Sequence, residues 1–254
     1  MKHLAILLCT TLLAAMSLAA ADTPVYELRV YTANEGKLPD LLKRFQDHTL
    51  KLFEKHGITN LGYFVPLDKE NGADTRLYVL LSHKSREAGE ASRKAFMEDP
   101  AWIALQKESE ASGKILAKPP EITYLKTTAY SPEVKVGAGA GPRVFELRTY
   151  TTAEGKLDSL HARFKDHTMA LFKKHGMTNL PYFTPLDADK GAANTLIYFL
   201  AHDSKEAGLK SFGAFRTDAD WVKAKGESEK DGSLTVKDGV KSVYLKATDF
   251  SPIK

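Results

Sequence analysis

The chain has 254 residues, of which 43% are hydrophobic and 27% are charged, and its formal net charge is +4. This composition is typical of a folded globular protein, it excludes extended disorder, and the length allows one large domain or two small ones. The positive charges are not concentrated enough to indicate binding to nucleic acid, so we expect no such partner.

The first residues predict a secretory signal peptide. The segment "MKHLAILLCTTLLAAMSLAAADTP" has one lysine, an apolar run over residues 4–18, and small residues at 19–21 that suit cleavage. We therefore expect residues 1–21 to be removed and the mature protein to be exported to the periplasm, with no attachment to the membrane. A retained anchor is the alternative, although the apolar run is shorter than the roughly 20 residues that a membrane span needs.

The only cysteine, Cys9, lies inside this predicted signal peptide. The mature chain would therefore contain no cysteine, which excludes disulfides, thiolate nucleophiles and cysteine-based zinc sites.

The remaining sequence is a tandem duplication. Residues 26–68 align with residues 145–187 without a gap, and 28 of the 43 aligned positions are identical. The period of about 119 residues is far longer than the 20–50 residues of solenoid repeats. We predict one domain over residues 22–130, a Gly/Pro linker over 131–142 that contains "EVKVGAGAGP", and a second domain over 143–254.

Each repeat begins with a strand followed by a helix. Polar and apolar residues alternate over 26–31, as in a strand, and apolar residues then recur every three or four positions over 36–56, as in an amphipathic helix. Gly57 stands where a glycine commonly ends a helix.

The second part of each repeat predicts two strands, two helices and a last strand. "ITNLGYFVP" and "TRLYVLLSH" are separated by a turn at Asn71 and Gly72, Ser85 is suited to cap the next helix, a short helix carries Trp102, and "EITYLK" ends the unit as a strand. The order β-α-β-β-α-β predicts an α+β fold of tandem ferredoxin-like domains, whose sheets pack face to face.

The first strand has two different faces. We expect Tyr26, Leu28 and Val30 to lie under the helices, and Glu27 and the other polar residues of the strand to occupy the face that no helix covers. If two such faces meet, buried charged groups would line a cavity between the sheets, where they need partners or a ligand.

The segments "YELRVYTANEGKL", "GYFVPLD" and "EDPAWIALQKES", most of which recur in the second repeat, resemble the NIPSNAP family. The second repeat departs from the last segment, because it has "DADW" at 218–221. The resemblance implies a dimeric α/β barrel built from two ferredoxin-like sheets, with an interior able to hold a small ligand. It does not imply a particular reaction.

The charged residues of the first strands are the main candidates for a binding site. A guanidinium offers paired donors to a carboxylate, and a neighbouring carboxylate can orient the guanidinium or act as a base. The alternative is an ion pair that completes a polar sheet face. The ligand-binding candidates are Glu27, Arg29, Tyr31, Glu146, Arg148 and Tyr150.

A second group of candidates consists of Asn60, Asn179, His48 and His167, which could hydrogen-bond a ligand or transfer a proton. A structural role is the alternative for each, and for His48 this would be a buried imidazole bonded to a carbonyl or an aspartate. For His83 and His202 we expect a surface or loop-fixing role. The alternatives are proton transfer and haem ligation, the latter because barrel relatives of the family include haem enzymes.

The sequence leaves three classes of function open, and it predicts no metal and no cofactor. The first is an exported NIPSNAP-like protein that binds a small, anionic or aromatic molecule in the barrel. The second is a cofactor-independent monooxygenase or isomerase, and the third is a non-catalytic interaction module. The sheets would pair within one chain or in a homo-oligomer, and catalytic residues stay unassigned.

Overall fold

The computed structural model describes residues 24–137 and 143–254. The predicted signal peptide and the glycine-rich centre of the predicted linker lie outside the described residues. Within the described ranges, no helix is long and apolar enough to cross a membrane.

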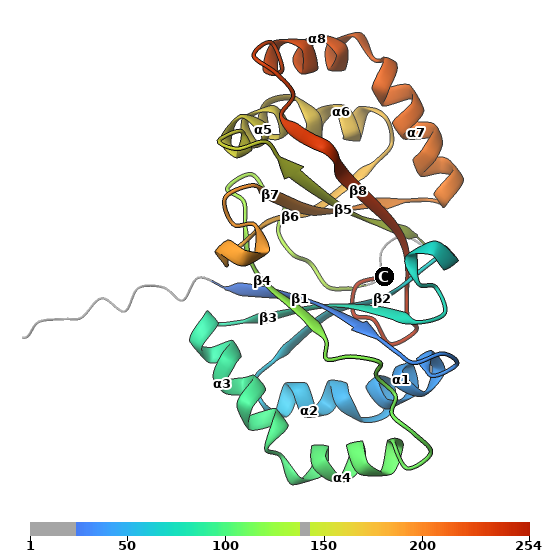
Figure 1. Ribbon diagram of the computed structural model, residues 1–254. Helices are drawn as coiled ribbons and strands as arrows, with labels where there is room; N and C mark the ends of the chain where they lie inside the picture. The colour runs from blue at the N-terminus through green and yellow to red at the C-terminus, as the bar shows by residue number, and fades with distance from the viewer. Residues whose placement is uncertain (1–23, 138–142) are drawn as a thin grey trace, which may run out of the picture.

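The two repeats fold into two similar halves, and the sheet of each half carries its helices on the outer side (Figure 1). The first half contains β1 (Val25–Thr32), α1 (Leu38–Arg44), α2 (Leu50–Lys55), β2 (Thr59–Pro66), β3 (Arg76–His83), α3 (Arg86–Met97), α4 (Pro100–Ser109) and β4 (Glu121–Thr127). The second half contains β5 (Val144–Thr152), α5 (Leu157–Arg163), α6 (Met169–Lys174), β6 (Thr178–Pro185), β7 (Thr195–His202), α7 (Lys205–Thr217), α8 (Ala219–Ser228) and β8 (Thr235–Ala247).

The predicted caps form. The hydroxyl of Ser85 accepts a hydrogen bond from the Ala88 amide at the start of α3. The structure adds a cap at Asp99, whose carboxylate accepts a hydrogen bond from the Ala101 amide at the start of α4. Gly57 has a φ angle of +74° just after α2, a backbone conformation that glycine adopts without steric cost.

The first predicted helix contains a π-helical turn, Phe45–Thr49, between α1 and α2, and the second half has the same feature at Phe164–Thr168. The Thr49 hydroxyl donates a hydrogen bond of 3.1 Å to the carbonyl of Arg44, which the wider turn leaves accessible. Because both copies contain the turn, it is a shared structural feature of the repeat.

The eight strands close into an antiparallel barrel in the order β1-β3-β2-β8-β5-β7-β6-β4. Each half contributes one sheet of ferredoxin-like order, and the halves join where β2 pairs with β8 and where β4 pairs with β6. Closing the barrel pairs the edge strands that an isolated sheet would leave exposed. The α+β fold of tandem ferredoxin-like units that the sequence predicts is therefore confirmed.

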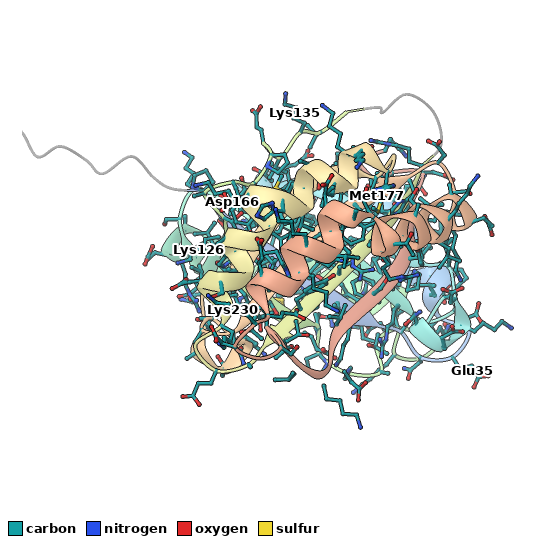
Figure 2. The ribbon with its side chains drawn as sticks, turned by 90° about the horizontal axis from the view of Figure 1, so that it is seen from above. Glu35, Lys126, Lys135, Asp166, Met177 and Lys230 are labelled. Atoms are coloured by element: carbon teal, nitrogen blue, oxygen red, sulfur yellow. The ribbon has the colours of Figure 1, made fainter. Side chains whose placement is uncertain are left out.

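The barrel interior is packed with apolar side chains from both halves. Leu28 and Phe64 of the first half lie in one cluster with Phe145 and Phe199 of the second, and the rings of Phe64 and Phe145 are 5.0 Å apart. Two further clusters lie between each sheet and its helices. In the second half, α8 lies alongside the α5–α6 helix over the outer face of the sheet (Figure 2).

Candidate functional site

The first strand places its polar residues under the helices, opposite to the prediction. Leu28 belongs to the cluster inside the barrel, whereas Tyr31 belongs to the cluster between sheet and helices. The guanidinium carbon of Arg29 lies 5.3 Å from the centre of the Phe53 ring, which α2 contributes. The expectation that Glu27 and Arg29 occupy a face free of helices is therefore wrong.

The reason lies in the partners that each face offers. The barrel interior supplies apolar neighbours from both sheets, whereas the helix side supplies a histidine, a tyrosine and aromatic rings to the charged groups. A buried ion pair is tolerated only where its polar atoms find hydrogen bonds, so the charged face of β1 turns toward the helices.

Glu27 and Arg29 form a forked ion pair that is almost fully buried, with exposed fractions of 0% and 4%. The Arg29 Nε donates to Oε1 of Glu27, and Nη2 donates to Oε2 over 3.0 Å. The Arg29 Nη1 lies 3.4 Å from the Tyr31 hydroxyl. This arrangement fixes the guanidinium plane beneath the helices.

The charges of this pair stabilise each other. Burial alone would raise the pKa of Glu27, but hydrogen bonds from His83 and Arg29 outweigh it and lower that pKa. Burial would likewise lower the pKa of Arg29, but the neighbouring Tyr31 oxygen and the Glu27 carboxylate outweigh it and raise that pKa. Both groups are therefore ionised in the folded protein.

His83 is part of this cluster, and its predicted surface or loop-fixing role is wrong. The side chain is buried at the end of β3, and its Nε2 lies 2.7 Å from Oε2 of Glu27. The buried Nδ1 has no hydrogen-bond partner among the described residues. Because a carboxylate can only accept, Nε2 of His83 is the donor in this contact.

A glycine on α3 makes room for the His83 ring. A Cβ atom at Gly89 would lie 2.9 Å from the Cγ of His83, and one at Gly208 would lie 3.0 Å from the Cγ of His202. The recurrence of this histidine six residues before a glycine, in both repeats, is the sequence signal that could have identified the pair.

The second half repeats the cluster with changes. The Arg148 Nη1 donates to Oε1 of Glu146 over 2.5 Å, and Nε2 of His202 lies 2.9 Å from Oε2. The Arg148 Nη2 lies 3.3 Å from the Tyr150 hydroxyl, and the hydroxyl of Ser242 donates to Oε1 of Glu146 over 2.5 Å. The first half has Ile122 where the second has Ser242.

A cavity of about 570 Å³ opens onto the first cluster. It lies between the β1 side of the sheet and the helices above it, with Arg29 and Tyr31 in its wall. Its apolar lining residues are Phe45, Phe53, Phe96, Met97, Trp102, Leu116, Ala117, Pro119, Pro120 and Ile122. This cavity lies between a sheet and its helices and not between the two sheets.

The charged lining of this cavity is predominantly positive. Arg44 lines the cavity and forms an ion pair of 3.1 Å with Glu110, and its guanidinium carbon lies 5.2 Å from the Trp102 ring. The remaining cations in the lining are Arg29, Arg93, Lys114 and Lys118, and Glu110 is the single lining carboxylate. With Arg29 paired to Glu27 and Arg44 paired to Glu110, the cavity keeps an excess of positive charge.

The secondary candidates lie away from this space. His48 and His167 are exposed on the outer side of their helices, so the predicted buried imidazole at His48 is wrong. Asn60 donates to the carbonyl of Leu50 and Asn179 to that of Met169, and each amide oxygen accepts a hydrogen bond from a nearby tyrosine, so both asparagines connect a strand to a helix.

A hollow of about 510 Å³ opens at one end of the barrel beside residues 132–137, and Asn179 is the one candidate residue that lines it. In the described ranges, no group of three or more His, Asp or Glu side chains is placed to hold a metal ion.

The family model described as NIPSNAP matches residues 26–132 and again residues 145–252. The two matched regions together span most of the chain and coincide with the two repeats. No protein of curated function matches the sequence.

Solved structures show the same fold across both halves. A proposed monooxygenase from Fusobacterium nucleatum is 12% identical, with coverage of 90% of this chain and 94% of that chain and a TM-score of 0.59. A proposed monooxygenase from Lactobacillus acidophilus is 14% identical, with coverage of 89% and 94% and a TM-score of 0.52. An anthrone oxidase-like protein is 14% identical, with coverage of 89% and 92% and a TM-score of 0.54. At these identities the likeness concerns the fold alone.

Proposed function

Since the chain belongs to the NIPSNAP family, we propose that it is an exported protein that binds a small amphipathic organic anion in the cavity between the first sheet and helices α2, α3 and α4. The observation that carries the proposal is a cavity of about 570 Å³ with apolar walls and with a buried arginine, Arg29, held in place by Glu27. Ligand pockets typically have volumes of about 300–1,000 Å³, apolar walls and a few fixed polar groups.

The apolar walls favour a ligand with an aromatic or aliphatic body. The ring centres of Phe53 and Phe96 lie 4.9 Å apart in an edge-to-face contact, and those of Phe96 and Trp102 lie 4.5 Å apart, so the rings on the helix side form one continuous surface. Burial of apolar ligand surface against such rings contributes roughly 25 cal/mol for each Å² removed from water.

Arg29 favours an anionic group on that ligand. A guanidinium has five N–H donors, and Arg29 directs two to Glu27 and one to Tyr31. The two other donors are available to a ligand oxygen, and hydrogen bonds between ionised groups are about twice as strong as those between neutral groups.

The proposal is tested by identifying the molecules that co-purify with the mature chain, by mass spectrometry of denatured protein. A Gln106→Trp variant would fill part of the cavity, because Gln106 lines it from α4. The matched control is Lys225→Trp, at the equivalent exposed position of α8. Loss of the co-purifying molecule only in Gln106→Trp supports the proposal, and equal retention in both variants would overturn it.

The mass of the same protein tests export, since removal of residues 1–21 is expected.

A monooxygenase without a cofactor is the second candidate. It is favoured by the Tyr31 hydroxyl, which lies in the cavity wall 3.4 Å from Arg29 Nη1, where a cation can stabilise an enolate or phenolate of a bound substrate. The shared fold of an anthrone oxidase-like protein suggests anthrone as the first compound to test. Oxygen uptake that depends on the protein and falls in Arg29→Ala would favour this candidate, and the absence of uptake would leave binding alone.

A further inference from the structure

The two halves differ at the residue that lies over the buried arginine. The alignment that matches His83 with His202 and Trp102 with Trp221 places Arg93 of α3 opposite Phe212 of α7. Phe212 is buried, and its ring centre lies 4.4 Å from the guanidinium carbon of Arg148. The second half therefore covers its arginine with an aromatic face.

Arg93 occupies the equivalent place in the first half, but it is exposed and lines the same cavity as Arg29. It forms no ion pair with the described residues, whereas Arg29 is paired with Glu27. A side chain at this position can reach the face of the neighbouring guanidinium, as Phe212 does. Two guanidinium groups that converge on one space repel each other unless an anion lies between them.

The carboxylates around this space already have cationic partners other than Arg93. Arg44 and Glu110 neutralise each other on the α4 side of the cavity, and Lys114 and Lys118 add two further positive charges to the lining. On α3 itself, Glu90 lies one turn before Arg93, and it pairs with Arg86.

We infer that the first half contains an oxyanion subsite between Arg29 and Arg93, which binds the carboxylate or phosphate group of a ligand whose apolar body lies against Phe53, Phe96 and Trp102. The second half has no equivalent subsite of this kind, because Phe212 takes the place of the second arginine. The inference rests on the proposed function and adds the charge class of the ligand, the residue that selects it and a stoichiometry of one anion for each chain.

Four naphthalene probes with the same apolar body test the inference: 2-naphthoate, 2-naphthyl phosphate, 2-naphthylmethanol and 2-naphthylmethylammonium. Isothermal titration of the mature full-length chain is expected to give one site, with both anions bound at least tenfold more tightly than the alcohol and the ammonium probe bound least. The ratio of the two anions distinguishes a carboxylate subsite from a phosphate subsite. Higher salt should weaken binding of the anions and leave the alcohol unaffected.

Arg93→Gln removes the proposed second donor while leaving Arg29 in place. It should lower the affinity for the more tightly bound anion by about ten- to a hundredfold and change the affinity for the alcohol by less than twofold. Arg93→Phe, which copies the second half, should do the same. The control is Arg216→Gln, which removes an exposed arginine from α7, away from the cavity, and should leave all four affinities unchanged.

The outcomes separate this inference from the proposed function. Equal binding of anions and alcohol, or anion affinity unchanged in Arg93→Gln, would overturn the subsite while leaving the cavity as a binding site. Two equivalent anion sites for each chain, or binding lost in Arg148→Ala but retained in Arg29→Ala, would overturn its assignment to the first half. Binding of none of the four probes would count against the proposed function and the subsite together.

Discussion

His83 Nε2 lies 2.7 Å from Oε2 of Glu27, and both side chains are buried beneath the helices. The same contact recurs at 2.9 Å between His202 and Glu146. The histidine supplies the donor that the carboxylate needs beyond its arginine, so it positions the Glu27–Arg29 pair and thereby the donors that face the cavity.

Replacement of this donor is expected to destabilise the fold. His83→Leu should lower the free energy of unfolding by about 1.5–3 kcal/mol, the usual contribution of a hydrogen bond to a charged group. His83→Gln, whose amide nitrogen can reach the same carboxylate, should recover part of this loss. His48→Leu is the control, because His48 is exposed and surface substitutions usually change stability by less than about 0.5 kcal/mol. Urea denaturation measures all three, and equal losses in His83→Leu and His83→Gln would contradict the role of Nε2.

The buried carboxylate predicts a loss of stability in acid. Burial opposes the charge of Glu27, but His83 and Arg29 lower its pKa below the ordinary value of about 4.3. A carboxyl whose pKa is lowered on folding contributes its full stabilisation at pH values above its pKa in the unfolded chain. This contribution is lost as the pH falls through its pKa in the folded protein. Stability should therefore decrease steadily below about pH 4.3.

Glu27→Gln should reduce this dependence on pH. At pH 7 the variant should be less stable by about 3–5 kcal/mol, because Arg29 is left buried without its counterion. Between pH 4.3 and pH 3 the difference between variant and wild type should shrink. A constant difference across this range, measured by urea denaturation at each pH, would show that Glu27 does not carry the acid sensitivity.

The glycine beside the histidine gives a prediction with an internal control. Gly89→Ala would place a Cβ atom 2.9 Å from the Cγ of His83 on a ring that is held by Glu27, so we expect destabilisation of about 1–3 kcal/mol. Gly213→Ala lies within α7, where an added Cβ would meet nothing within 4 Å, and should stabilise the protein by up to about 1 kcal/mol through helix propensity. Thermal unfolding of the two variants should give shifts of opposite sign.

The serines that end each repeat connect the halves reciprocally. The Tyr63 amide of the first half donates to the Ser251 hydroxyl over 3.0 Å, and the Tyr182 amide of the second half donates to the Ser131 hydroxyl over 2.9 Å. Ser251→Ala should cost about 1–3 kcal/mol, since it leaves a buried amide without an acceptor. Ser159→Ala on the exposed surface of α5 is the control, and an equally small effect of both substitutions on the urea midpoint would contradict the prediction.

Much of the fold was predictable because it depends on local patterns. The duplication, the order of strands and helices, the cap at Ser85 and the helix end at Gly57 follow from spacing and from residue chemistry within a few positions. The same patterns could not reveal the π-helical turn at Phe45–Thr49, which keeps the apolar spacing of an ordinary helix. They also could not place His83, because its partner Glu27 lies 56 residues earlier in the chain.

Glu27, Arg29 and Tyr31 were predictable as residues of one face of β1, because side chains alternate along a strand with a period of two. The direction in which that face points depends on packing between distant parts of the chain. Closure of the barrel buries both faces of each sheet, and alternation cannot tell a face packed against another sheet from a face packed against helices. The choice rests on long-range partners: the apolar face meets the other half, and the charged face meets His83 and the aromatic rings of the helices. For that reason the cavity lies between sheet and helices, with Arg29 in its wall.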